Sequence, residues 1–172
     1  MMQELFIGLG LVALRIVAAM ALSAGALYSG MGLLDRLTSG IEEWKEVRKG
    51  NAAMGVLVLS VMLSMMLLME PLIVAFVYSI RTDIAFPAVA LILGFTLFNY
   101  IAGLLASTVL IFLTINLADR LTPDIEEFAE LKKGNIAVAL VLGAAIVLIS
   151  LAVRGPLESG FDMLITLESG ML

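Results

Sequence analysis

Four polar side chains interrupt long apolar stretches of the sequence, and their types could support chemistry inside a membrane. They are Arg15, Glu70, Asn99 and Arg154. An ionisable group at the centre of a bilayer costs at least about 2.5–3.5 kcal/mol, so such groups pair with one another or line a polar path. The residue types predict an intramembrane polar cluster in which the Glu70 carboxylate pairs with Arg15 or with Arg154.

The four residues share one depth along their apolar stretches. Each lies 18 or 19 positions from the end that adjoins a polar loop, which is about 27–29 Å at the rise of an α-helix. This depth matches the far hydrocarbon edge of a bilayer about 30 Å thick. Two interpretations therefore stay open: a buried ion-paired cluster, or separate residues that mark the membrane boundary, with the arginines reaching the headgroups.

The elements that must position these residues are four apolar stretches, each long enough to cross a bilayer as a helix. Of the 172 residues, 62% are hydrophobic and 15% are charged, whereas soluble domains are roughly half apolar and about a quarter charged. We therefore predict an all-α polytopic membrane protein with four transmembrane helices, surrounded by membrane lipid. The stretches cover residues 5–34, 52–80, 84–117 and 136–153.

The residues that are missing narrow the possible functions. The chain contains no Cys and no His, and its net charge is −5. Thiolate and imidazole metal sites, Cys–His catalysis and Ser–His catalysis are excluded. The negative charge argues against a nucleic-acid partner, which requires clustered Lys and Arg. We expect no catalytic residue, no cofactor and no metal site, and thus a protein that is not an enzyme.

The polar loops reveal an internal repeat. Residues 35–51 and 119–135 align without gaps at an offset of 84, with 11 of 17 positions identical. Because the matching residues are mostly polar, chance similarity between apolar helices does not explain the alignment. We predict one membrane domain over 1–172, built from parallel helix–loop–helix repeats at 5–80 and 84–156, with a short outer tail at 157–172. Pro71 and Pro156 occupy equivalent positions and predict a kink or a break in their helices.

Each repeated loop predicts a short helix with a narrow apolar stripe. Glycines that follow can end these helices, and Asn51 and Asn135 are suited to cap the next transmembrane helix. The simplest interpretation is a pair of interfacial helices that lie flat on the membrane. A docking surface for a partner protein and an acidic, cation-collecting vestibule are the alternatives. The stripe residues are Ile41, Trp44 and Val47 in the first loop and Ile125, Phe128 and Leu131 in the second.

The distribution of positive charge predicts the orientation of the chain. Seven of the ten Lys and Arg residues lie in loops 35–51 and 119–135. Loops rich in Lys and Arg remain in the cytoplasm. We therefore expect both loops to be cytoplasmic and both termini to lie outside.

The repeated motif, Ile-Glu-Glu-aromatic followed by Lys-Gly-Asn, resembles the YjfL-type family of small prokaryotic membrane proteins. The resemblance extends over nearly the whole chain. It implies a multi-pass four-helix bundle in the cell (inner) membrane of a prokaryote. The function of that family is unknown, so no activity is transferred. Its members often occur near genes of phage-shock-type membrane maintenance, which implies a membrane-maintenance protein as a partner at the cytoplasmic loops.

Two functional hypotheses follow. The first is a structural or scaffolding bundle that forms homo-oligomers or supports membrane maintenance, because small-residue helix faces and interfacial loops are the most conspicuous features. The alternative is a small oligomeric ion channel or transporter in which the four polar residues form a polar layer along the route.

Overall fold

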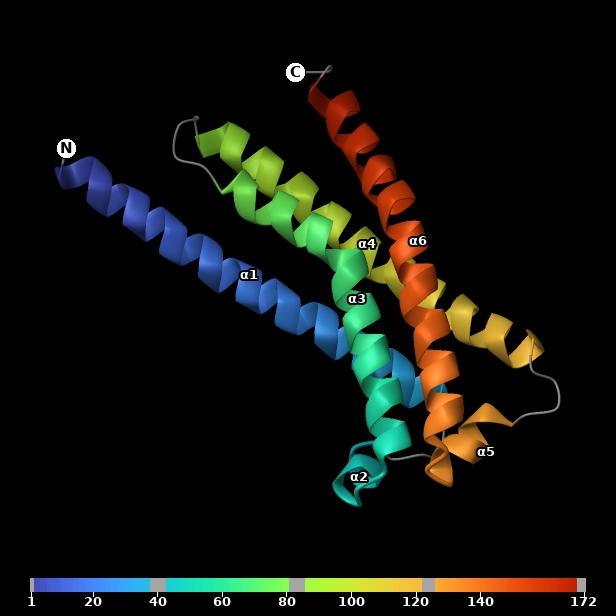
Figure 1. The fold of residues 1–172 in the computed structure, drawn as a ribbon. Helices are drawn as coiled ribbons and strands as arrows, with labels where there is room; N and C mark the ends of the chain where they lie inside the picture. Colours follow the sequence, from blue (N-terminus) through green and yellow to red (C-terminus); the bar gives the residue numbers. More distant parts are fainter. Residues whose placement is uncertain (1, 38–42, 81–85, 122–125, 170–172) are drawn as a thin grey trace.

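A computed structural model of the chain describes residues 2–37, 43–80, 86–121 and 126–169 (Figure 1). These residues form helices and no strand. The helices are α1 (Met2–Leu37), α2 (Glu43–Arg48), α3 (Ala52–Ser79), α4 (Phe86–Leu121), α5 (Glu127–Lys132) and α6 (Ile136–Ser169).

The four long helices α1, α3, α4 and α6 have the length and composition to cross a membrane. The predicted all-α class and the four transmembrane helices are therefore confirmed. The short helices α2 and α5 lie together at one end of the bundle, which we call the loop end (Figure 1). The start of α1, the end of α3, the start of α4 and the end of α6 lie toward the opposite end, which we call the turn end.

Helix α3 is the centre of the bundle. It packs most extensively on α6, and also on α1 and α4. Val61, Met65 and Met69 of α3 are completely buried. An α-helix that is apolar around its whole circumference must be surrounded by other helices or by lipid, and three neighbours surround α3.

The contact between α3 and α6 depends on a close approach at Gly143. A Cβ atom placed on Gly143 would clash with Ser60 Oγ and lie 3.2 Å from Ser60 Cβ. Ser60 is held in place because its hydroxyl donates to Val56 O at 2.8 Å. Small residues allow membrane helices to approach closely, and packing then stabilises the pair.

Helix α1 contacts α3 near the loop end, whereas α4 contacts α3 and α1 nearer the turn end. At Gly30, near the loop end, a Cβ atom would lie 3.3 Å from Met65 Cβ, so α1 lies close against α3 there. Nearer the turn end, Tyr100 of α4 donates its hydroxyl to Leu22 O at 2.7 Å, which connects α4 to α1. The first half of α1 and the last turns of α4 diverge from the bundle in opposite directions (Figure 1).

Neither proline ends its helix. Pro71 lies inside α3 and Pro156 inside α6, so the predicted break does not occur and α6 runs on to Ser169 rather than stopping before a separate tail. Proline removes one backbone donor and crowds the preceding turn, which bends a helix more readily than it breaks one in an apolar environment. Helix α3 changes direction between its two halves (Figure 1).

The loop-end turns of the two repeats are the same structure. Gly50 and Gly134 have φ values of 88° and 82°. Asn51 N donates to Glu46 O and Asn135 N to Glu130 O, both at 3.0 Å. This pattern is the Schellman motif, in which a left-handed residue terminates a helix, and glycine adopts that conformation without strain.

We expect Gly143→Ala to lower the free energy of unfolding by about 1–3 kcal/mol, the usual cost of overpacking. The loss should be smaller in a Ser60→Ala background, because the closest clashing atom is removed. Unfolding in mixed micelles measures both effects. Gly155→Ala is the control, since nothing lies within 4 Å of a Cβ atom there. Equal losses at positions 143 and 155 would contradict the packing account.

Candidate functional site

One ion pair joins the two repeats inside the membrane-spanning part of the bundle. Arg154 of α6 donates to the carboxylate of Glu70 of α3. The two residues are exactly one repeat apart, with a separation of 84 positions. A contact between equivalent positions of two related units lies on the axis that relates them. The Glu70–Arg154 pair therefore marks the pseudo-two-fold axis of the chain.

Arg15 does not join this pair. Its Nη2 and Nε atoms donate to Ile80 O at 2.9 and 3.3 Å, and its guanidinium lies 5.4 Å from the ring centroid of Tyr78. Ile80 is the C-cap of α3, where backbone carbonyls lack partners within the helix. Of the two partners that the sequence left open for Glu70, Arg154 makes the contact and Arg15 completes the end of α3.

Asn99 forms a hydrogen bond with neither the Glu70–Arg154 pair nor Arg15. Its side chain is 2% exposed, and neither of its polar atoms has a hydrogen-bond partner among the described residues. Its neighbours one turn away, Thr96 and Gly103, face α3: the Thr96 hydroxyl lies 3.3 Å from Ser79 Oγ, and Gly103 faces Leu72. The expected four-residue cluster is therefore corrected to one ion pair, one arginine at a helix end and one buried amide. Equal depth along the helices did not give equal height in the bundle, because Arg15 contacts Ile80, which lies about 15 Å beyond Glu70 along α3.

The two predicted cap residues differ in their contacts. Asn51 Oδ1 accepts from Met54 N at 3.1 Å and caps α3, while Asn51 Nδ2 donates to Leu131 O of the other repeat at 2.9 Å. The Asn135 oxygen accepts from Val138 N at 3.3 Å, and its amide donates to Glu130 at 2.9 Å, within its own repeat. Only the first of these two asparagines thus connects the loops of the two repeats.

The apolar stripe of the loop helices packs largely on the bundle. Leu131 is fully buried, and Val47 and Phe128 pack against the core. Trp44 is 52% exposed and is the stripe residue that could reach the headgroups. Ile41 and Ile125 lie outside the described residues. The stripe thus packs partly on the bundle, and that the two helices lie flat on the membrane stays a prediction.

Three acidic residues of the loops, Glu43, Glu46 and Glu130, lie in surroundings that shift their pKa values. Burial raises the pKa of Glu43, and a side-chain hydrogen bond with Asp35 adds to this rise. The Lys49 ammonium, 2.6 Å from the carboxylate, lowers the pKa of Glu46. Hydrogen bonds from Asn135 and Lys133 lower the pKa of Glu130. A cation-collecting vestibule is not favoured by these contacts, and no group of three metal-ligating side chains lies together in the described part of the chain.

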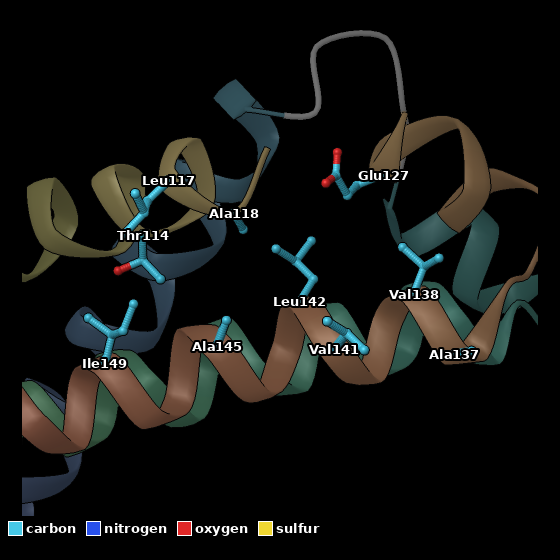
Figure 2. A pocket seen from close by; sticks show the side chains of 10 residues that line it. All are labelled: Thr114, Leu117, Ala118, Glu127, Ala137, Val138, Val141, Leu142, Ala145 and Ile149. Atoms are coloured by element: carbon cyan, nitrogen blue, oxygen red, sulfur yellow. The ribbon is translucent and has the colours of Figure 1, made fainter. Parts of the chain in front are cut away.

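Two cavities were not predicted from the sequence. A cavity of about 310 Å³ lies between α4, α5 and α6 (Figure 2), and a second of about 300 Å³ lies between α1 and the second half of α3, beside Arg15. Aligning the repeats position by position would have pointed to the first, because several bulky residues of repeat one are replaced by smaller ones. The first is lined by Thr114, Leu117, Ala118, Glu127, Ala137, Val138, Val141, Leu142, Ala145 and Ile149.

Comparison with known protein families assigns the chain to one of them. The profile described as Domain of Unknown Function (DUF350) matches the chain twice, over residues 6–99 and 90–171. The chain belongs to the DUF350 family. The two tandem matches confirm the internal repeat, and together with the four apolar helices they describe an integral membrane protein of unknown function. No curated protein and no solved structure matches the chain significantly.

We expect Asn51→Ser to lower the free energy of unfolding by about 1–2 kcal/mol. Serine still caps the helix, so the loss reports the hydrogen bond between the repeats. Asn135→Ser is the matched control and should cost less, because it removes a contact within one repeat. Unfolding of both variants in mixed micelles tests this. A larger loss at Asn135 would show that the bond to Leu131 does not hold the repeats together.

We expect Glu70→Gln and Arg154→Gln each to destabilise the protein by about 1–3 kcal/mol, because each leaves one charge without its partner. The exchanged pair, Glu70→Arg with Arg154→Glu, should recover most of this loss. Thermal unfolding in lipid nanodiscs measures the series. If the exchanged variant is as unstable as the singles combined, the two side chains do not act as a pair.

Proposed function

We propose that the chain is a structural membrane protein that self-associates, and that it is not an enzyme. The uncovered apolar surface of α1 carries this proposal. None of the most apolar 18-residue stretch of α1 is buried within the chain. Phe6, Val17 and Met20 are 67%, 63% and 68% exposed.

Lipid alone does not account for this surface. Helices α1 and α4 each contain 36 residues, which corresponds to about 54 Å, whereas the hydrocarbon core is about 30 Å thick. Tilt shortens the crossing, but membrane helices tilt by about 20° on average and rarely beyond 40°. Part of each helix therefore projects beyond the hydrocarbon, and a second copy of the chain can cover the apolar part of α1.

The location and partners belong to the same proposal. Loops rich in Lys and Arg support a cytoplasmic loop end and outer termini, and the resemblance to the YjfL-type family supports the cell (inner) membrane of a prokaryote. The same resemblance supports a membrane-maintenance protein as the partner at the loop end, where Trp44 is exposed.

An oligomeric ion channel or transporter is the alternative. The half-exposed Glu70 and the partly exposed Arg154 support it, because an ion pair on the surface of one chain could line a path between chains. The separation of Arg15 and Asn99 from that pair weighs against it. Cation flux in liposomes that changes with Glu70→Gln would support a channel, and absence of flux from correctly assembled protein would argue against one.

Disulfide cross-linking in native membranes tests self-association. The natural chain has no Cys, so single-cysteine variants along residues 5–17 report contacts between copies. We expect oxidised dimers at positions on one face of α1, such as Leu9→Cys. The control is Leu140→Cys on α6, which is 56% exposed and should remain monomeric. Monomers at every α1 position, with a single copy per nanodisc, would contradict the proposal.

A further inference from the structure

The two repeats place equivalent residues in different surroundings at the loop end. In repeat one, α1 and α3 close over this region, and Leu34, Met54, Leu57, Val61 and Met65 are completely buried. The positions 84 residues later are Ala118, Val138, Val141, Ala145 and Ile149, all of which line the cavity between α4, α5 and α6. The same surface is thus filled by the chain itself in one repeat and left open in the other.

A single position explains much of this difference. Gly30 allows α1 to lie against Met65 of α3. Its equivalent in α4 is Thr114, which lines the cavity and whose hydroxyl donates to Leu110 O at 2.9 Å. The larger side chain keeps α4 away from α6, and the smaller residues at 118, 138 and 145 do not fill the space. Leu117 and Val141, 48% and 67% exposed, show that the cavity reaches the molecular surface.

The shape of the cavity limits what can occupy it. Its α6 lining runs from Ala137 to Ile149, a length of about 18 Å. A helix with its side chains is 10–12 Å in diameter and would occupy roughly 1,400–2,000 Å³ over that length. The cavity, at about 310 Å³, is several times too small for it. One extended hydrocarbon chain, with carbon contacts at about 4 Å, is narrow enough to enter.

The polarity of the cavity points to the same occupant. Thr114 and Glu127 are its polar lining side chains, and Glu127, the first residue of α5, lies at the loop end of the cavity (Figure 2). Arg120 in the last turn of α4 and Lys132 in the last turn of α5 are exposed at this end. The slot is apolar along its length, and its loop end carries the Glu127 carboxylate, with Arg120 three residues after Leu117 and Lys132 five residues after Glu127. An amphiphile that has an acyl chain and a headgroup with both a phosphate and an amine is complementary to this arrangement.

We propose that the cavity between α4, α5 and α6 binds one acyl chain of a membrane phospholipid, with the lipid phosphate at the loop end near Arg120 and Lys132. The acyl chain takes the place that Leu34, Met54 and Val61 fill in repeat one. Filling the slot restores the carbon contacts that α4 and α6 lack. This site is independent of self-association, since it is complete within one chain.

Transplanting the residues of repeat one into repeat two tests the proposal. The variant Ala118→Leu, Val138→Met, Ala145→Val gives the cavity the side chains that close its counterpart. Wild type and variant are reconstituted into vesicles of palmitoyl-oleoyl phosphatidylethanolamine and phosphatidylglycerol, then extracted into mild detergent. Native mass spectrometry counts the phospholipid retained per chain. We expect the variant to retain roughly ten-fold less, because the lost carbon contacts weaken binding.

Two controls make the result decisive. Ala144→Val adds the same atoms to an exposed position of α6 outside the cavity and should retain lipid as the wild type does. Ala145→Val alone is a milder change, and it should also lower lipid retention, so it replaces the triple variant if that variant does not fold.

Equal retention by wild type and Ala145→Val would overturn the proposal. Retention of added palmitic acid but not of phospholipid would also overturn it. Cross-linking through α1 should be unchanged in either variant, so this proposal and the proposed self-association fail separately.

Discussion

The packing of α3 against α6 is the contact on which the rest of the bundle depends. These helices are equivalent elements of the two repeats, and their close approach at Gly143 fixes the pseudo-two-fold axis that the Glu70–Arg154 pair marks. In a bilayer the hydrophobic effect does not drive helices together, so close packing and a few polar contacts must do so. Helices α1 and α4 then attach to this central pair, and their heights and angles follow from the surfaces that α3 offers.

Divergence between the repeats accounts for most of the features with functional interest. An exact two-fold pair would place like charges together on the axis, whereas Glu70 and Arg154 are complementary. Asn51 connects the two loops and Asn135 does not, although both follow the same glycine turn. Gly30 and Thr114 set different helix separations. Duplication supplied the architecture, and substitutions at equivalent positions made one repeat closed and the other open at the loop end.

The length of the helices connects this architecture to the proposed role. A single chain buries α3 well but leaves much of α1 and the end of α4 uncovered. Lipid can surround the part within the hydrocarbon, and a second copy is suited to the apolar part beyond it. The contacts of the polar residues are mostly structural: Arg15 completes a helix end, and Glu70 and Arg154 join two helices. The proposed self-associating bundle that binds lipid would use all of these features.

The all-α class, the four membrane helices, the tandem repeat and the loop helices could be predicted from the sequence, because hydropathy and repeated polar motifs are local properties of the chain. Position along a helix is also local, so the equal spacing of Arg15, Glu70, Asn99 and Arg154 from the loops was predictable. The helices are shifted relative to one another, however, and Arg15 lies beside Ile80, about 15 Å beyond Glu70 along α3. Which of these residues meet depends on helix rotation and crossing. In an almost uniformly apolar helix such as α3, no polar face reveals that rotation. Tertiary structure alone paired Glu70 with Arg154, placed Arg15 on Ile80 and buried Asn99. It also opened the cavity in repeat two, because close packing at a few small residues sets the distance between helices.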